Sequence, residues 1–151
     1  MGSRSRSRRV LILGSSGSIG TQAIEIITAR EDLEPVGLAV GRDWRTAVTQ
    51  AKSLGLETIA VADPAAAAEA RESFAGNVIE GGTAGVEMIG LTAPDIVLNG
   101  IVGAAGLGPT VAALTGGIDV ALANKESLVI GGELVTELAA ATGARLLPVD
   151  S

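Results

Sequence analysis

The sequence contains no cysteine, no histidine and, among aromatic residues, only Trp44 and Phe74. Without cysteine the chain can form neither disulfides nor thiolate metal sites. Without histidine, any general acid or base must be Lys, Asp, Glu, a hydroxyl group, water or a bound cofactor. The scarcity of aromatic rings removes the stacking platforms on which single-stranded nucleic acids bind.

Long apolar runs and a basic stripe are also missing. No run approaches the roughly 18 apolar residues that span a membrane, and the formal net charge of −6 argues against a nucleic-acid surface. Residues 1–9, MGSRSRSRR, alternate serine and arginine and lack the apolar segment of a secretory signal. We predict a disordered basic leader here, and a weak RNA- or phosphate-binding arm is the alternative. The protein is expected to be soluble and cytoplasmic, without membrane or nucleic-acid partners.

Short apolar runs alternate with helical segments along the rest of the sequence. With 151 residues, 47% of them hydrophobic, the chain can bury one sizeable core. The alternation predicts an α/β, Rossmann-like doubly wound fold, with a mostly parallel sheet and helices on both faces. Ligands in such sheets bind at the carboxyl ends of the strands. The expected strands are residues 10–13, 35–40, 58–62, 77–80, 95–101 and 119–123.

A glycine-rich turn follows the first apolar run. Val10–Leu13 ends at Gly14, and Gly17 and Gly20 follow before a segment with helical periodicity, residues 21–29. In dinucleotide-binding turns the first glycine permits the tight turn, the second lets N–H groups approach a diphosphate, and the third lets the helix pack closely. The spacing G-x-x-G-x-x-G is a variant of the common G-x-G-x-x-G, so the flanking strand and helix carry the prediction of a phosphate site.

The second expected strand ends at Gly41, Arg42 and Asp43, about 20 residues past the glycine turn, where dinucleotide folds read the adenosine ribose. An acidic side chain there binds the 2′-hydroxyl of NAD, whereas the planar guanidinium of arginine pairs with the 2′-phosphate of NADP. Because Arg42 comes first off the strand, we favour NADPH. The alternative is that both side chains are solvated and that Asp43 caps the next helix, residues 44–54.

Two further polar or glycine-rich segments follow later strands. Residues 102–109 form a second glycine-rich turn after the strand that contains Asn99, whose side chain we expect to be satisfied by a sheet or loop hydrogen bond. Asn124, Lys125 and Glu126 follow the sixth strand. Lys125 could orient an anionic substrate, while Asn124 and Glu126 could bond the ribose and amide of a cofactor. On spacing alone, these residues could equally end the strand, face solvent and begin the next helix.

Four segments resemble the amino-terminal domain of the 1-deoxy-D-xylulose 5-phosphate reductoisomerase family: LILGSSGSIGTQA, IVGAAGLGPTVAAL, LANKESLVIGGELV and LLPVDS. The resemblance covers nearly all of residues 10–151. It implies an NADPH-binding Rossmann-like domain of an enzyme of non-mevalonate isoprenoid biosynthesis. By this resemblance, the family enzyme rearranges 1-deoxy-D-xylulose 5-phosphate and reduces the resulting aldehyde with NADPH to 2-C-methyl-D-erythritol 4-phosphate. It uses a divalent metal, Mg²⁺ or Mn²⁺.

The resemblance also implies roles for individual residues. Lys125 and Ser151 match substrate contacts, Asp150 matches a metal ligand, and Lys125 and Asp150 would carry catalysis. Asp43 stands where asparagine is familiar, which places an acid near the expected 2′-phosphate. The residues that match NADPH-binding positions are Ser16, Gly17, Ser18, Ile19, Gly41, Arg42, Asp43, Asn124 and Glu126.

In the family the last motif continues past Ser151 with another acidic metal ligand, the rest of the catalytic domain and a helical carboxyl-terminal domain. A single carboxylate such as Asp150 holds Mg²⁺ poorly, because hard cations need several oxygen ligands. We therefore expect this chain to bind NADPH and to turn over no substrate. The full-length protein would act on a phosphorylated sugar, and the resemblance allows a homodimer. The alternatives are a free-standing dinucleotide-binding module without catalysis and the cofactor domain of another NADP-linked reductase.

Overall fold

The computed structural model of the chain describes residues 6–123 and 125–149, and of residues 125–130 the backbone alone. The described residues form one parallel sheet with helices between its strands. The strands are β1 (Arg8–Leu13), β2 (Leu33–Val40), β3 (Thr58–Val61), β4 (Asn77–Glu80), β5 (Ile96–Asn99), β6 (Asp119–Leu122) and β7 (Leu146–Pro148). The helices are α1 (Ser18–Thr28), α2 (Trp44–Leu54), α3 (Pro64–Ser73), α4 (Ala84–Thr92), the short 3-10 turn η1 (Ala104–Gly106), α5 (Leu107–Thr115) and α6 (Lys125–Thr142).

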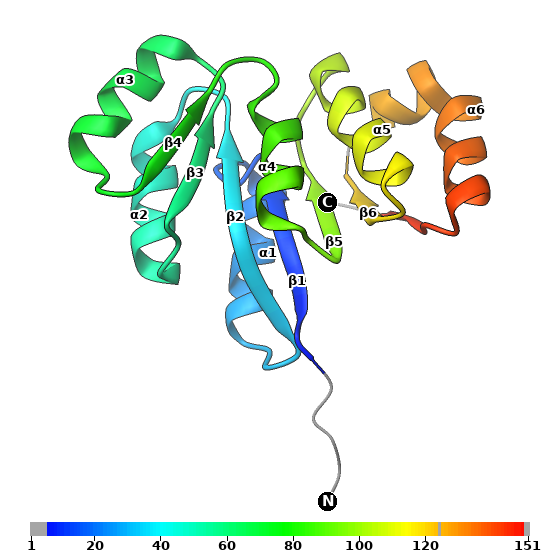
Figure 1. Ribbon diagram of the computed structural model, residues 1–151, viewed down its shortest axis with the longest axis horizontal. Coiled ribbons are helices and arrows are strands. Elements are labelled where there is room, and N and C mark those ends of the chain that lie inside the picture. Colours follow the sequence, from blue (N-terminus) through cyan, green and yellow to red (C-terminus); the bar gives the residue numbers. More distant parts are fainter. Residues whose placement is uncertain (1–5, 124, 150–151) are drawn as a thin grey trace, which may run out of the picture.

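The order of the strands across the sheet is β4-β3-β2-β1-β5-β6-β7 (Figure 1). The chain builds outward from β1 to one edge at β4, returns to the other side of β1 as β5, and continues outward to β7. The direction of winding therefore reverses between β1 and β5, which pair in parallel. In doubly wound sheets the ligand binds outside the carboxyl ends of the strands at this switch point.

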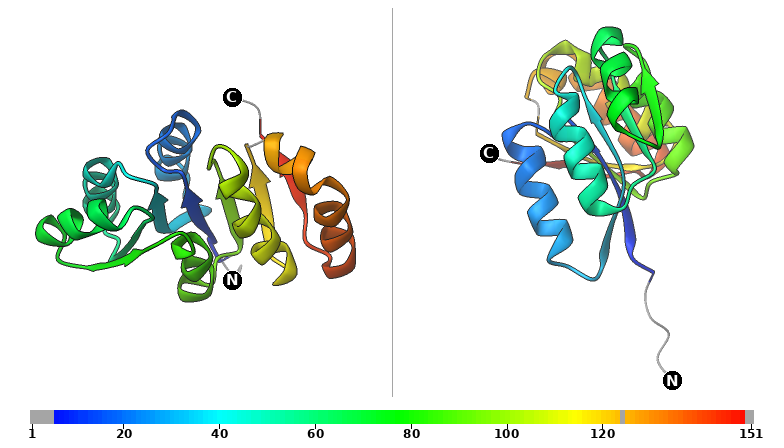
Figure 2. Two further views of the ribbon diagram at one scale, coloured as in Figure 1. Left: turned by 90° about the horizontal axis from the view of Figure 1, so that it is seen from above. Right: turned by 90° about the vertical axis from the view of Figure 1, so that its left-hand side faces the viewer.

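The sheet is buried on both faces by two separate apolar cores. Successive side chains of a strand point to opposite faces, so Val10 and Ile12 of β1 join one core and Leu11 and Leu13 join the other. Helices α1, α2 and α3 contribute to the first core, and α4, α5 and α6 to the second (Figure 2). This double burial explains why the strands read as continuous apolar runs. The predicted fold class is confirmed.

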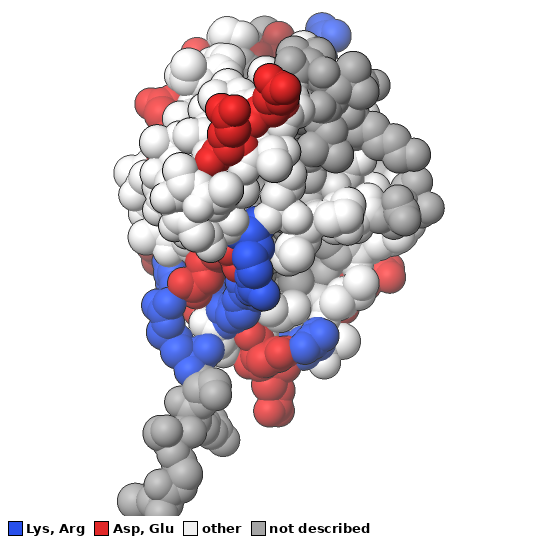
Figure 3. Space-filling view, turned by 90° about the vertical axis from the view of Figure 1, so that its right-hand side faces the viewer, with Lys and Arg blue, Asp and Glu red and all other residues white. Residues whose placement is uncertain are grey.

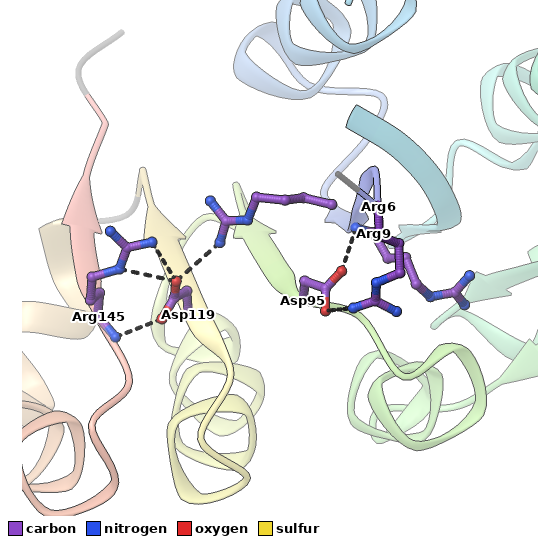
Figure 4. Close-up of polar contacts among 6 residues, drawn as sticks. Arg6, Arg9, Asp95, Asp119 and Arg145 are labelled. Atoms are coloured by element: carbon purple, nitrogen blue, oxygen red, sulfur yellow. Dashed lines mark hydrogen bonds and ion pairs between the residues drawn. The ribbon is translucent and has the colours of Figure 1, made fainter. Parts of the chain in front are cut away.

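The sheet begins earlier in the chain than we predicted. β1 starts at Arg8, so two of the arginines that we assigned to the leader belong to the strand. Arg6 pairs with Asp95 at 2.6 Å and Arg8 with Asp119 at 3.0 Å (Figure 4). Basic and acidic side chains are accordingly intermingled near the place where the described chain begins (Figure 3). The reason is tertiary, because the carboxylates that hold these arginines follow them by 80 residues or more.

Asp119 is the most heavily bonded of these carboxylates. It accepts hydrogen bonds from the backbone N–H of Arg145 at 2.8 Å and from its guanidinium at 2.9 and 3.2 Å. Burial opposes the ionisation of Asp119, but these hydrogen bonds and the charges of Arg145 and Arg8 outweigh it and hold the pKa of the carboxyl below its ordinary value. The bonds tie β1, β6 and the start of β7 together at the amino end of the sheet.

Other boundaries also differ from the prediction. The helix expected at residues 128–141 begins at Lys125 and bends at Gly131, whose φ and ψ of −115° and 19° are not helical. The strand expected at residues 95–101 ends at Asn99. Strand β7 pairs with β6 and was not among the expected strands. None of the described helices combines the length and the apolar character that crossing a membrane would require.

Candidate functional site

The turn after β1 presents backbone N–H groups at the carboxyl end of the strand. Gly14 has a φ of 78°, a left-handed conformation that glycine adopts without strain. The N–H of Gly14 donates to Ala39 O in β2 at 2.8 Å, and the N–H of Gly17 donates back to Gly14 O at 3.2 Å. Within the described chain the N–H of Ser16 has no hydrogen-bond partner. Gly17 is the N-cap of α1 and no side chain caps this helix, so its positive end is open to an anion.

Close packing around the turn explains two of its glycines. A Cβ atom on Gly14 would lie 2.8 Å from the carbonyl carbon of Gly100, which follows β5. A Cβ on Gly20 would lie 2.3 Å from Gly14 O, so the third glycine lets α1 approach the turn as we predicted. A Cβ on Gly17 would meet only Gly14 O, at 3.5 Å, which is ordinary contact. Gly17 is therefore not required by packing inside the chain, and its open side faces the cleft described next.

A cleft of about 440 Å³ runs along the carboxyl ends of five strands. Ser16 and Gly17 line it from the first turn, and the ends of β2, β3, β4 and β5 supply the remaining wall. Small residues dominate this wall, which leaves room for a ligand to lie against the backbone. Val102 adds an apolar side chain with 85% of its surface exposed. A larger cavity of about 880 Å³ lies at the opposite end of the sheet, away from both glycine turns.

The side chains of Arg42 and Asp43, which follow β2, differ in their contacts. The carboxylate of Asp43 caps α2 with both oxygens, accepting from Thr46 N at 3.3 Å and from Thr46 Oγ1 at 2.8 Å. The alternative that Asp43 caps the next helix is therefore confirmed. Arg42 is exposed, and its guanidinium makes no ion pair or hydrogen bond with a described residue. Gly41, which precedes it, lines the cleft. The arginine is thus free to meet a phosphate at this end of the cleft.

Asn99 organises the second glycine turn. Its side chain is fully buried, and Nδ2 donates to Gly106 O and to Thr110 Oγ1, both at 2.8 Å. Its Oδ1 accepts from Ile101 N at 3.2 Å. The expectation that a loop hydrogen bond satisfies the Asn99 side chain is confirmed. The carboxamide fixes the wall of the cleft between β5 and α5.

The remaining candidate residues lie at or beyond the limits of the described chain. Asn124, Asp150 and Ser151 fall outside the described residues. Lys125 and Glu126 begin α6, directly after β6, and the structure describes their backbone alone. Because β6 is parallel to β1 with only β5 between them, the start of α6 lies at the same edge of the sheet as the glycine turn. The described residues contain no group of three acidic, histidine or cysteine side chains that could hold a metal.

One contact at the site was missed in the sequence. Gln50, at the end of the second turn of α2, donates from Nε2 to Ser15 O at 2.9 Å. The two residues are 35 positions apart, and no short-range pattern connects them. The only local signal is that Gln50 is a polar residue on a helix whose neighbouring positions Ala47 and Ala51 are buried.

A parallel sheet that reverses its winding beside a glycine turn, with a cleft across the strand ends, defines a Rossmann-like α/β domain of the dinucleotide-binding class. The family model of 1-deoxy-D-xylulose 5-phosphate reductoisomerase matches residues 10–132. The chain belongs to this family. Membership removes the alternative of another NADP-linked reductase.

Individual relatives agree in sequence and in structure. The 1-deoxy-D-xylulose 5-phosphate reductoisomerase of Rhodococcus jostii is 49% identical over 148 residues, which cover 97% of this chain and 36% of the relative. The solved enzyme of Zymomonas mobilis, in complex with NADPH, superposes with a TM-score of 0.89 at 33% identity and covers 97% of this chain and 39% of that one. A solved reductoisomerase in complex with magnesium gives a TM-score of 0.88 at 31% identity, over 94% of this chain and 37% of that one. The chain thus spans little more than a third of the length of these relatives.

Proposed function

We propose that the chain is the NADPH-binding domain of a 1-deoxy-D-xylulose 5-phosphate reductoisomerase. The observation that carries this proposal is the cleft at the switch point, which is lined by Ser16 and Gly17 at the uncapped positive end of α1 and by Gly41, directly before the exposed Arg42. The superposition with the NADPH complex of the Zymomonas mobilis enzyme supports the choice of cofactor.

The described residues fit the parts of NADPH. The N–H groups of Ser16, Ser18 and Ile19 suit the diphosphate, because they stand at the positive end of α1 without a capping side chain. Gly17, whose own N–H donates to Gly14 O, lines the cleft with its open side and leaves room for the ligand. Arg42 suits the 2′-phosphate, since a guanidinium binds phosphate through two parallel hydrogen bonds. Asp43 keeps its negative charge, but it serves as the cap of α2, where both of its oxygens accept hydrogen bonds from Thr46. The bound cofactor would supply the hydride for reduction.

The substrate and metal functions of the whole enzyme rest on the resemblance. Lys125 begins α6 at the same edge of the sheet as the cleft, where it could meet the phosphorylated sugar. Asn124 and Glu126 would add cofactor contacts, Asp150 a metal ligand and Ser151 a substrate contact. We expect the chain on its own to bind NADPH without turnover, because a single carboxylate such as that of Asp150 holds a hard cation poorly. A homodimer and a cytoplasmic location stay predictions for the full-length protein.

A titration of the chain with NADPH and NADH, followed by the fluorescence of the reduced nicotinamide, tests the proposal. We expect NADPH to bind at least about tenfold more tightly, because the 2′-phosphate gains a charge-assisted interaction with Arg42. Arg42→Gln should remove most of this preference and leave the affinity for NADH nearly unchanged.

Lys52→Gln is the matched control, because it removes one exposed positive charge from the last turn of α2, the helix that follows Arg42. It should change the preference for NADPH over NADH by no more than about twofold, because Lys52 lies at the opposite end of α2 from Arg42 and an exposed charge there is largely screened. If neither nucleotide binds, the proposed function is wrong. Equal affinity of the unmodified chain for NADPH and NADH would remove the role of Arg42.

A further inference from the structure

The turn that we assign to the diphosphate is held from behind by a side chain of another helix. Gln50 Nε2 donates to Ser15 O at 2.9 Å. The atom that faces the Ser15 carbonyl must be the amide nitrogen, because a carbonyl oxygen only accepts hydrogen bonds. Ser15 is fully buried, and its own N–H donates to Ala39 O at 3.1 Å. Ser15 is thus bonded through its N–H to β2 and through its C=O to α2.

This bond determines the orientation of the next amide. The C=O and N–H of a trans peptide group point in opposite directions. Holding Ser15 O toward α2 therefore turns the N–H of Ser16 away from α2, and Ser16 lines the cleft. The same N–H has no partner among the described residues. Gln50 consequently presets a donor of the turn without touching the cleft itself.

The energetics of the contact indicate a role in the turn rather than in the core. Among the described residues, the buried side-chain atoms without a hydrogen-bond partner are Ser15 Oγ and Gln50 Oε1, which belong to the two residues that form this contact. Unpaired buried oxygens are unfavourable, and an apolar side chain of similar size would avoid that cost at position 50. Polar groups that are costly for folding are expected where function requires them.

We propose that Gln50 is a positioning residue, which aims the N–H of Ser16 at the cofactor diphosphate by holding the Ser15 carbonyl. The inference rests on the proposed function, because it deepens the account of that site. It predicts that the carboxamide matters for the diphosphate and not for the adenosine end of the cofactor, although α2 begins directly after Arg42 and Asp43.

The test compares three variants of the chain. Gln50→Leu keeps the bulk and removes the donor, Gln50→Glu keeps the shape and replaces the donor with a carboxylate, and Thr49→Ala changes an exposed neighbour on the same helix. Binding is measured with NADPH and with adenosine 2′-monophosphate, which carries the 2′-phosphate and lacks the diphosphate. Melting temperatures are recorded for each variant.

Gln50→Leu should weaken the binding of NADPH about tenfold, which is the change expected for one lost hydrogen bond to an oriented amide. Gln50→Glu should weaken it at least as much. Adenosine 2′-monophosphate should bind all variants within about twofold, and Thr49→Ala should match the unmodified chain for both ligands. The melting temperature of Gln50→Leu should stay within about 3 °C, because the lost hydrogen bond is offset by removal of an unpaired oxygen.

The inference is overturned if Gln50→Leu binds NADPH as well as the unmodified chain does, or if it loses both ligands equally. The second result would mean general damage to α2. A complete lack of NADPH binding by the unmodified chain would instead refute the proposed function. The amide resonance of Ser16 in ¹⁵N–¹H spectra then decides the inference without a ligand: it should move in Gln50→Leu and stay in Thr49→Ala, and an unmoved resonance contradicts the proposed contact.

Discussion

Substitution of Gly20 by alanine offers the sharpest test of how the cofactor turn is built. The added Cβ would lie 2.3 Å from Gly14 O, 2.6 Å from Ser15 Cα and 2.8 Å from the carbonyl carbon of Ser15. All three atoms are backbone, so no side-chain rotation can relieve the overlap. Ordinary contact begins at 3.4 Å, and α1 must therefore shift by about 1 Å away from the turn.

Overpacking of this kind costs about 1–3 kcal/mol, and we expect about 3 kcal/mol here because the neighbours are rigid. For a chain of this length, each kcal/mol lost from the free energy of unfolding lowers the melting temperature by about 2–4 °C. Gly20→Ala should therefore lower the melting temperature by about 6–12 °C, measured by circular dichroism. It should also weaken the binding of NADPH strongly, because α1 no longer packs against the turn that we assign to the diphosphate.

Gly90→Ala in α4 is the matched control. It is also a helical glycine, and a Cβ there meets nothing within 4 Å. Alanine should stabilise this helix by about 0.5–1 kcal/mol through its higher helix propensity. The same substitution thus has opposite signs at the two positions. If Gly20→Ala melts within about 2 °C of the unmodified chain, the close approach of α1 to the turn is wrong.

Three further substitutions test other parts of the structure. Asp119→Asn should lower the free energy of unfolding by about 1–2 kcal/mol at neutral pH. Because folding lowers the pKa of Asp119, its carboxylate stabilises the fold above the ordinary pKa of 3.8, and this stabilisation is lost as the pH falls through the lower pKa of the folded state. The free energies of unfolding of the two proteins, measured by urea titration, should therefore converge in acid. Asn99→Leu should cost about 2–4 kcal/mol in thermal melting, because it leaves Gly106 O and Thr110 Oγ1 buried without their donor; an unchanged melting temperature would contradict that network. Ala93→Gly should raise stability by about 0.5–1 kcal/mol, since Ala93 ends α4 at a φ of 45°, which strains any residue but glycine.

Local patterns sufficed for much of the fold. Strands buried on both faces are continuous apolar runs, and helix ends carry their signals in adjacent residues. Asp63 caps α3 by accepting from Ala66 N at 2.9 Å, directly before Pro64, and Gly55 ends α2 with a φ of 70°. The glycine turn and its neighbouring strand could be predicted for the same reason.

What the sequence did not reveal depends on distant partners. Arg8 belongs to β1 because it pairs with Leu33 of β2, and Asp119, far along the chain, binds its guanidinium. Strand β7 is three residues long and ends in Pro148, so that only its pairing with β6 makes it a strand. Asp43 could be interpreted as a ribose ligand or as a helix cap, and the cap contact depends on the position of Thr46. The only local signal for Gln50 was its place beside the buried Ala47 and Ala51, which does not reveal its partner Ser15.

Both glycine turns are fastened by carboxamides, Gln50 at the first and Asn99 at the second. Such groups neither gain nor lose protons under physiological conditions, and the chain has no imidazole to do so in their place. These hydrogen bonds therefore do not depend on pH near neutrality. Any change in nucleotide affinity in that range should follow the second ionisation of the nucleotide's own 2′-phosphate, which for phosphate monoesters lies near pH 6.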